Sequence, residues 1–400
     1  MSQSLPGRPL LVLDIARYVA GPAAATILAD FGADVIKLED PEVGGDPIRY
    51  NGPGPHGMSY LWQVEARNKR SVTLNLRKPQ ARDILRDLAG RADVLIENFR
   101  PGTMAAWGLG YIELARINPG LVFVSVSGYG QDGPYRDRSA VDATAAAFGG
   151  MSYLTGYPDG PPARPVLFIA DWMCALFGAV GILEALRRRD GPAGTGRGSY
   201  IDLALYEPLL RVADSSIADY YVAQVLRERN GGVSNVVAPA GYYQCGDGRW
   251  LAITVPTLTS FLTFGRLVGC VWPTDTGEVT PECRDNRPVI ESVMTKWALN
   301  QPAAEAVEAL CGAGIPAAVV NSAADLISDP HVRARGNLVQ VAGADGEALL
   351  MQGVLPRLDA DPGAVRWAGQ SLGASNSYLY NELLGLPESE LAGLRQDGVI

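Results

Sequence analysis

The chain has 400 residues, of which 47% are hydrophobic and 19% are charged, which suffices for a large core and indicates about two domains. Its formal net charge of −9 makes a nucleic-acid partner unexpected, because phosphate backbones bind basic surfaces. Scattered cysteines predict reduced thiols, and no signal-peptide pattern opens the chain, so we expect a cytoplasmic protein. No window approaches the roughly 18 apolar residues of a membrane span, so no membrane partner is expected.

The first half of the chain alternates predicted strands and helices. A strand at 10–13, a helix at 23–31 that ends at Gly32, and a strand at 35–38 form a β-α-β unit, which predicts a parallel sheet. The pattern continues with a helix at 80–91, a strand at 93–96, a short helix at 112–117, a strand at 121–126, a helix from 172 to Arg187-Arg188-Arg189, a strand at 200–203 and a helical stretch from 206 towards 229. We therefore expect an α/β fold with a large Rossmann-like parallel-sheet domain.

A change of composition at Asn230-Gly231-Gly232 predicts a hinge. The residues that follow predict a smaller α/β domain, with a hairpin at 241–244 and 250–255, helices at 257–268, 287–299 and 302–311, and a strand at 317–320. We expect residues 1–228 to form the large domain, 229–330 to form the small one, and 331–400 to return to the large domain.

Asp171 separates a strand-like apolar run at 166–170 from the apolar helix that begins at Trp172. Asp is a preferred helix N-cap, so the residue can be purely structural. It can also be a placed chemical group, because the positive end of a helix keeps a carboxylate ionised and an ionised carboxylate is a nucleophile. The two interpretations are compatible.

Other familiar chemistries find little support in the residues. The two histidines, His56 and His331, lie far apart, no His-x-x-His or Cys-x-x-Cys pair suggests a metal site, and no Gly-x-Ser-x-Gly elbow is present. Residues 128–133 spell G-x-G-x-x-G, but Pro134 and polar residues follow where a helix should begin, so we expect a loop beside a site. The arginine cluster fits a helix C-terminus.

Several segments, similar in order and spacing, resemble the class III coenzyme A transferases, which include formyl-CoA transferase, carnitine CoA-transferase and the related α-methylacyl-CoA racemases. The segments that carry the resemblance are Leu13-Asp14, Ala20-Gly21-Pro22, 28–39, 68–71, 97–102, 127–130, 133–135, 155–160, 329–332 and 334–336. They span nearly the whole chain. The resemblance implies a fold that interlocks two identical chains, with the active site where the large and small domains meet.

The resemblance also implies roles for particular residues. Asp171 corresponds to the family's catalytic aspartate, and Asp142 to an acidic residue that lines the acyl site. Asp40, Ala106 and Ser139 stand where formyl-CoA transferase has basic CoA contacts, so the CoA phosphates are expected to use other cations, from among Lys69, Arg77, Arg100, Arg136 and Arg138. The residues that we expect around CoA are Val19, Ala20, Leu74, Arg77, Asn98, Phe99, Arg100, Arg138, Ser139 and Asp142.

The activity that the resemblance implies is transfer of CoA from an acyl-CoA to a small carboxylic acid, with no metal. Asp171 would form a mixed anhydride and then an aspartyl-CoA thioester. Succinyl-CoA, acetyl-CoA and formyl-CoA are candidate donors. Water must be kept from the anhydride, so residues 128–133 and 236–241 are candidate closing loops.

Two other functions remain open at this point. One is a racemase or isomerase of 2-methylacyl-CoA thioesters, with Asp142 or Asp171 as the base, and the other is a CoA-binding protein without catalysis. The racemases carry a histidine just before the residue that corresponds to Asp142, where this chain has Val141. Because racemisation needs a second acid-base group across the α-carbon, Val141 favours the transferase.

We accordingly expect the protein not to epimerise 2-methylacyl-CoA thioesters. The aliphatic side chain of Val141 cannot exchange a proton. Deuterium uptake at the α-carbon in heavy water measures the reaction, and uptake as fast as CoA transfer would contradict the expectation.

Overall fold

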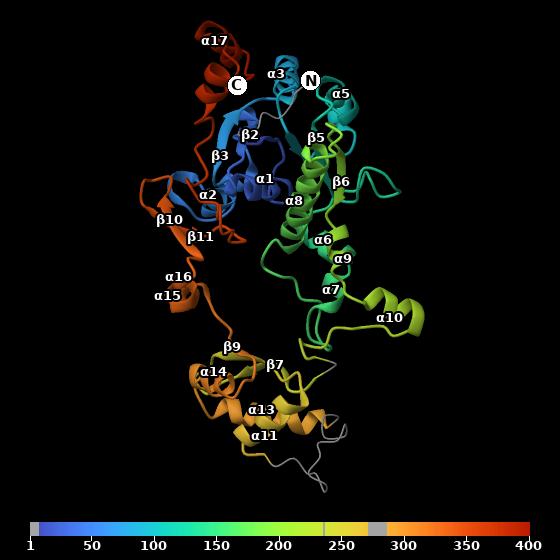
Figure 1. Cartoon of the computed structure of the whole chain (residues 1–400), viewed down its shortest axis with the longest axis vertical. Coiled ribbons are helices and arrows are strands. Elements are labelled where there is room, and N and C mark those ends of the chain that lie inside the picture. Colours follow the sequence, from blue (N-terminus) through green and yellow to red (C-terminus); the bar gives the residue numbers. More distant parts are fainter. Residues whose placement is uncertain (1–7, 235–236, 271–285) are drawn as a thin grey trace. The chain divides into compact units, whose positions relative to one another are not determined.

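The computed structural model describes residues 8–234, 237–270 and 286–400, which form two compact units (Figure 1). Unit 1 comprises Met1–Ser152, Arg164–Val225 and Arg333–Ile400, and unit 2 comprises Tyr153–Ala163 and Leu226–Val332. Residues 153–163, expected in the large domain, belong to unit 2 instead. The reason is local pairing, since the Gly231 N–H donates to the Gly156 carbonyl oxygen at 2.9 Å and Tyr153 donates to Glu228.

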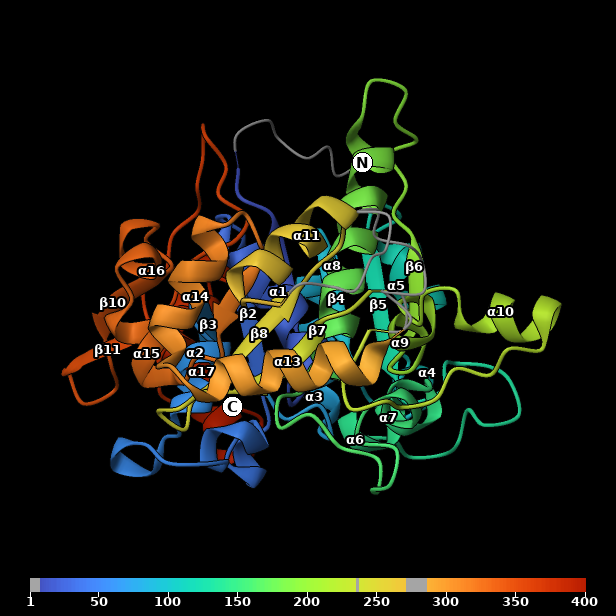
Figure 2. The same cartoon turned by 90° about the horizontal axis from the view of Figure 1, so that it is seen from below.

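Unit 1 is built on a parallel sheet, as the alternating pattern predicted. Its strands are β1 (Leu11–Asp14), β2 (Asp34–Glu39), β3 (Lys69–Thr73), β4 (Val94–Glu97), β5 (Val122–Ser127) and β6 (Tyr200–Ala204). They lie in the order β3-β2-β1-β4-β5-β6, which is the doubly wound dinucleotide-fold order and spreads across Figure 2. The mixed α/β fold is therefore confirmed. Strand β3 was not predicted, because its residues are mostly polar.

Helices cover both faces of this sheet (Figure 1). On one face α1 (Ala20–Asp30) packs along α8 (Ile169–Asp190), and their small and aliphatic side chains share one buried core with β1, β4 and β5. On the other face α3 (Pro79–Ala89) and α5 (Tyr111–Ile117) share a second core with the C-terminal residues. Shorter elements of unit 1 are η1 (Pro41–Val43), η2 (Pro47–Tyr50), η3 (Pro55–Gly57), α2 (Tyr60–Glu65), α4 (Thr103–Ala106), α6 (Asp142–Phe148) and α7 (Met151–Leu154), which runs into unit 2.

Helix α8 differs from two expectations, a strand at 166–170 and the absence of an apolar stretch as long as a membrane span. The apolar run at 166–170 forms no strand, because α8 already begins at Ile169, and Val166 and Leu167 are 95% and 74% exposed. Within the described ranges, α8 is also the helix that is long and apolar enough to cross a membrane, by length and composition only. One side packs on α1 and the sheet, while Leu176, Val180 and Leu183 are exposed. As expected, the three arginines end the helix.

The helical stretch expected from 206 to 229 is broken. It forms α9 (Glu207–Arg211) and α10 (Ser216–Ala223), separated at Asp214 and stopped at Gln224, both of which have left-handed backbone. No residue of α10 is buried, and the helix projects from the rest of unit 1 in both views (Figures 1 and 2).

Unit 2 confirms the expected small α/β pattern. Strands β7 (Ala240–Gln244), β8 (Trp250–Thr254) and β9 (Ala317–Val319) form an antiparallel sheet, and β7 and β8 are the expected hairpin. Helices α11 (Leu258–Leu267), α13 (Arg287–Leu299) and α14 (Ala303–Gly312) cover it around a core that contains Phe261, Phe264 and Met294. Helix α15 (Ala323–Ser328) follows, and α16 (Pro330–Ala334) leads back to unit 1.

The last residues lie along strand β3, at the edge of the sheet. After the hairpin of β10 (Leu338–Ala342) and β11 (Ala348–Gln352), Trp367 donates to the Lys69 carbonyl oxygen at 3.1 Å. Tyr380, in η4 (Tyr378–Leu383), donates to the Thr73 carbonyl oxygen at 2.5 Å, and α17 (Glu388–Gln396) follows. The segment therefore covers the open edge of β3, which would otherwise expose unpaired backbone groups.

Candidate functional site

A cavity of about 250 Å³ lies where the strand order reverses, at the carboxyl ends of β1, β2, β3 and β4. Open α/β sheets bind ligands at this position, because the loops after the two central strands diverge there. Leu38, Leu74 and Leu76 give the cavity an apolar side, and Phe99 and Trp107 pack edge to face at 5.3 Å between ring centres. The other lining residues are Ile15, Arg17, Asp40, Arg77, Arg100 and Thr103.

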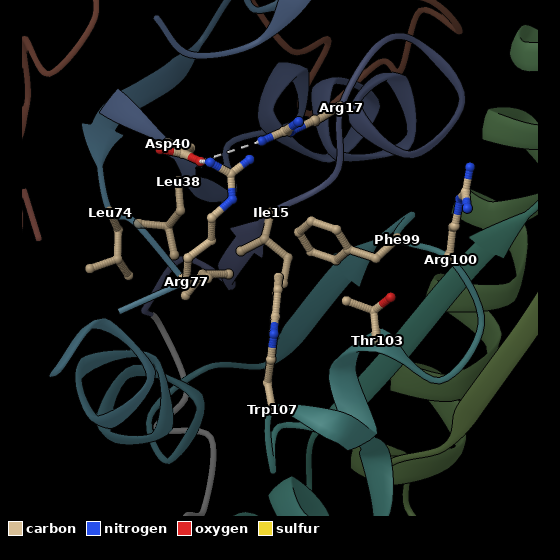
Figure 3. A pocket seen from close by; sticks show the side chains of 11 residues that line it. Ile15, Arg17, Leu38, Asp40, Leu74, Arg77, Phe99, Arg100, Thr103 and Trp107 are labelled. Carbon is tan, nitrogen blue, oxygen red and sulfur yellow. Dashed lines mark ion pairs between the residues drawn. The ribbon is translucent and has the colours of Figure 1, made fainter. Parts of the chain in front are cut away.

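The charged groups of this cavity are mostly positive. Figure 3 shows Arg17 and Arg77 directed towards Asp40, which lies 3.9 Å from an Arg17 nitrogen and 3.3 Å from an Arg77 nitrogen. Arg100 lies apart from them beyond Phe99, and no carboxylate pairs with it in the described part of the chain. Arginine groups bind phosphate well, so a cavity lined by three guanidinium groups and one carboxylate suits a phosphate-bearing ligand.

The loop between β1 and α1 is held by polar side chains from other segments of unit 1. Asn98 accepts from the Arg17 N–H at 2.8 Å and donates to the Arg17 carbonyl oxygen at 2.7 Å. Asp46 accepts from the N–H of Tyr18, whose φ of 64° is left-handed, and lies 3.0 Å from the Lys37 ammonium. Lys37 also donates to the Ala16 carbonyl oxygen. The position of Arg17 at the cavity mouth therefore depends on side chains from three other segments.

The structure brings together some of the expected CoA residues. Leu74, Arg77, Phe99 and Arg100 line the cavity, whereas Asn98 holds the Arg17 backbone. Arg17 also lines the cavity but was not predicted. Its place in the first β-α turn, the usual phosphate-binding turn of such sheets, is the signal that could have indicated it.

Other expected CoA residues lie elsewhere. Val19 and Ala20 are buried at the start of α1. The expectation that Lys69 binds phosphate is wrong, because its ammonium is buried against Asp14 at 2.8 Å. Arg138 stacks over Tyr135 and, like Ser139, lies in an exposed loop outside the cavity lining. Residues 128–140 are this loop, and no helix begins before α6, as expected. Of the second candidate loop, Val236 lies outside the described residues.

Asp171 is the third residue of α8 and not its N-cap. Phe168 precedes the helix, and its side chain cannot cap it. The carboxylate of Asp142, at the start of α6, accepts instead from the N–H groups of Ala170 at 2.8 Å and Asp171 at 3.3 Å. The interpretation of Asp171 as the N-cap is therefore wrong, and its own carboxylate is left for another role.

Burial dominates the electrostatics of Asp171. The residue is 8% exposed, and burial, followed by the nearby charge of Asp142, raises its pKa to about 7. Burial and this neighbouring charge thus outweigh the helix dipole, which was expected to favour the ionised form. Cys174, one turn further, is buried, and burial with the charges of Asp171 and Glu207 raises its pKa. A thiol that stays protonated is a poor nucleophile.

Topology places Asp171 at the same edge of the sheet as the cavity. Helix α8 connects β5 to the parallel strand β6, so its first turn lies at the carboxyl edge, as does the first turn of α1. Because α1 and α8 pack together and α1 follows the Arg17 loop directly, the buried carboxylate and the cationic cavity belong to one edge of unit 1.

Residues 9–376 match the model of CoA-transferase family III. The chain belongs to this family. It is 39% identical to the succinyl-CoA–D-citramalate CoA-transferase of Chloroflexus aurantiacus over all of both chains, and 41% identical to the succinyl-CoA–L-malate CoA-transferase beta subunit of the same organism, over 99% of this chain and 98% of that one. The protein is thus a CoA-transferase, and the resemblance inferred from the motifs is confirmed.

A solved structure of a CAIB/BAIF family protein from Brucella suis supports the same assignment. It superposes with a TM-score of 0.84 at 30% sequence identity and covers 95% of this chain and 100% of that one. The fold of this family III chain is therefore shared along nearly its whole length.

A second cavity, of about 370 Å³, lies at the opposite, amino edge of the sheet. Its cations are engaged, since Arg70 pairs with Asp34 at 2.8 Å and stacks on Tyr378, and Arg8 pairs with Asp93 at 3.0 Å. We regard it as part of the packing of the C-terminal segment. Within the described ranges, no group of three or more His, Cys, Asp or Glu residues could hold a metal ion.

Replacement of Asp171 by Asn is expected to stabilise this family III protein more at pH 8 than at pH 5. An unfolded Asp has a pKa of about 3.9, and the folded value is about 7. Between these two pKa values the folded state binds one proton more than the unfolded state, so the free energy of unfolding of the wild type falls as the pH rises from about 3.9 to about 7. Asn does not titrate, so the variant does not lose this stability. Thermal unfolding from pH 5 to 8.5 measures this, with the exposed Asp137→Asn as a control; an equal gain at both pH values would contradict it.

Proposed function

We propose that the protein is an acyl-CoA:carboxylate CoA-transferase in which Asp171 is the nucleophile. The observation that carries the proposal is a buried carboxylate that caps no helix and sits at the same sheet edge as a cationic, partly apolar cavity. A carboxylate with a pKa of about 7 is partly ionised at neutral pH and more basic than an ordinary aspartate, which suits attack on a thioester.

The cavity at β1–β4 is the proposed nucleotide end of the CoA site. The phosphates of CoA would bind Arg17, Arg77 and Arg100, and the adenine would contact the apolar lining and the Phe99–Trp107 pair. Asp40 holds Arg17 and Arg77 so that both guanidinium groups are oriented before CoA binds. The phosphate-binding cations would thus come from different positions than in formyl-CoA transferase.

The reaction divides into acyl transfers that regenerate Asp171. Its carboxylate attacks the donor acyl carbonyl, the carbon–sulfur bond breaks, and a mixed anhydride and CoA thiolate form. The thiolate attacks the aspartyl carbonyl, releases the donor acid and leaves an aspartyl-CoA thioester. The acceptor carboxylate then displaces the thiolate from this thioester, and the thiolate attacks the acceptor carbonyl of the new anhydride, which frees Asp171. No net proton is gained or lost.

We propose succinyl-CoA as the donor and a small dicarboxylic hydroxy acid as the acceptor. The two Chloroflexus relatives are named for succinyl-CoA together with D-citramalate or L-malate, and they align over almost the whole chain. Formyl-CoA with oxalate is disfavoured by Asp40, Ala106 and Ser139. A cytoplasmic location, expected from the cysteines, stays a prediction.

We further propose that two copies interlock into a homodimer. Support comes from the exposed apolar residues Leu176, Val180 and Leu183 of α8 and from α10, where Tyr221 and Val222 are 83% and 80% exposed. Apolar surface of this extent is usually covered by another chain. An assembly of unlike subunits is the alternative, because one relative is named a beta subunit.

Asp171→Ala is expected to lower CoA transfer by at least about a thousand-fold, because it removes the nucleophile itself. Wild-type protein mixed with succinyl-CoA should gain a hydroxylamine-sensitive mass adduct on the peptide that contains Asp171. Circular dichroism checks that the variant is folded. More than a tenth of wild-type turnover in Asp171→Ala would contradict the assignment, and so would an adduct at another residue.

Arg77→Ala is expected to raise the KM for succinyl-CoA about ten-fold while kcat changes by less than about two-fold, because the lost phosphate contact serves ground and transition states alike. The matched control is Arg188→Ala, which removes an exposed arginine paired with Glu184 in the last turn of α8. Steady-state kinetics at constant ionic strength measure both. An unchanged KM in Arg77→Ala would refute its phosphate contact.

An interlocked dimer is expected to stay dimeric on dilution, because unthreading requires unfolding. Sedimentation at nanomolar concentration should give one species of twice the 42.5 kDa chain mass. A folded single-chain species that reassociates rapidly would exclude the interlocked arrangement, and a requirement for a second gene product would favour unlike subunits.

A further inference from the structure

The helix that carries Asp171 is capped by a residue from another helix. The first N–H groups of a helix have no partner within it, and Phe168, before α8, offers no side-chain acceptor. Asp142, 28 residues earlier than Ala170, accepts from the N–H of Ala170 at 2.8 Å and, at 3.3 Å, from the N–H of Asp171 itself. One carboxylate therefore holds the backbone on which the nucleophile stands.

The carboxylate of Asp142 bonds to α8 and not to its own helix, whose N-cap Val141 has no side-chain capping bond. At the start of α6 the Thr144 hydroxyl accepts from the Val141 N–H at 2.9 Å and donates back to the Val141 carbonyl oxygen. The carboxylate of Asp142 is only 5% exposed and points to α8. Its second oxygen lies 3.9 Å from a nitrogen of Arg164, whose side chain is largely exposed, so little of its charge is neutralised.

We propose that Asp142 is the positioning residue of Asp171, fixing the first turn of α8 through two backbone hydrogen bonds while its charge disfavours the free carboxylate of Asp171 relative to its acylated form. The inference rests on the proposed function. Acylation turns the buried anion at 171 into a neutral anhydride or thioester, which removes the repulsion from Asp142. Asp142 would thus act on the reaction without touching the reacting atoms.

Few other charges face this pair. Within α8 the neighbouring titratable group is Cys174, whose thiol stays protonated, and Glu207 of α9 acts on Cys174. Arg164, from the segment before α8, faces Asp142. Apart from burial, Asp142 is the cause that raises the pKa of Asp171. Removal of the Asp142 charge should therefore lower the pKa of Asp171.

The test compares Asp142→Asn with Asp142→Ala. Asn keeps an oxygen that can cap α8 but removes the charge, whereas Ala removes both. In the Asn variant we expect the titration midpoint of Asp171 to fall by about one pH unit. Carbon-13 NMR of protein with labelled aspartate measures this midpoint, and the signal that is missing in Asp171→Asn identifies Asp171. We expect kcat to fall at least about ten-fold in the Ala variant at unchanged KM, and to recover mostly in the Asn variant.

Asp137→Asn is the control, because it removes an exposed acid from the loop before α6. An unmoved midpoint in Asp142→Asn would overturn the inference, and so would an Ala variant as active as wild type or an Asn variant as impaired as Ala. If the Ala variant fails to fold, the titration midpoint of Asp171 in the Asn variant is by itself the test of the inference. Failure of the proposed function is a separate outcome, in which the wild-type protein transfers no CoA. The NMR titration does not depend on activity, so it still tests the effect of Asp142 on Asp171.

Discussion

Between β1 and β4 the order of the strands reverses, so the loops that follow them run to opposite sides of the sheet. This divergence opens the cavity and brings Arg17, from the first loop, opposite Phe99 and Arg100, from the second. The helices begin at the same edge for a second reason, because each parallel crossover leaves the carboxyl end of one strand and its helix carries the chain back to the amino edge. The reversal thus places the cationic cavity, and the crossover from β5 to β6 places the carboxylate of Asp171 at the same edge of the sheet.

Buried charges keep the first loop in place. Asp14 lies between two ammonium groups, 2.8 Å from Lys69 and 3.6 Å from Lys37, and all three side chains are almost fully buried. Removing one partner from such a set typically costs about 3–5 kcal/mol, because a buried charge is left unpaired. These two lysines are therefore committed to the fold, whereas the arginines that line the cavity remain available for a phosphate.

The sequence predicted most of the fold because most strands are apolar and separated by helices of recognisable period. It missed β3, since Lys69 and Ser71 read as polar loop, although Asp14 and Glu39 satisfy them inside. It placed a strand at 166–170, since apolar residues usually mark burial, yet Val166 is exposed. Asp171 could be found by its isolation between apolar runs. That Asp142 caps α8 could not be foreseen, because the contact joins residues 28 positions apart.

Charge is distributed unequally between the two parts of the proposed site. Three arginines and one carboxylate line the cavity, whereas two carboxylates, Asp142 and Asp171, share the start of α8. A CoA ester carries its phosphates at one end and its thioester at the other, so the phosphates are attracted to the first part and repelled by the second. The charge of Asp142 also raises the free energy of ionised Asp171, and the proposed acylation would remove that charge. In the proposed mechanism, the unequal distribution would both orient the substrate and favour the acylation step, in which Asp171 loses its negative charge.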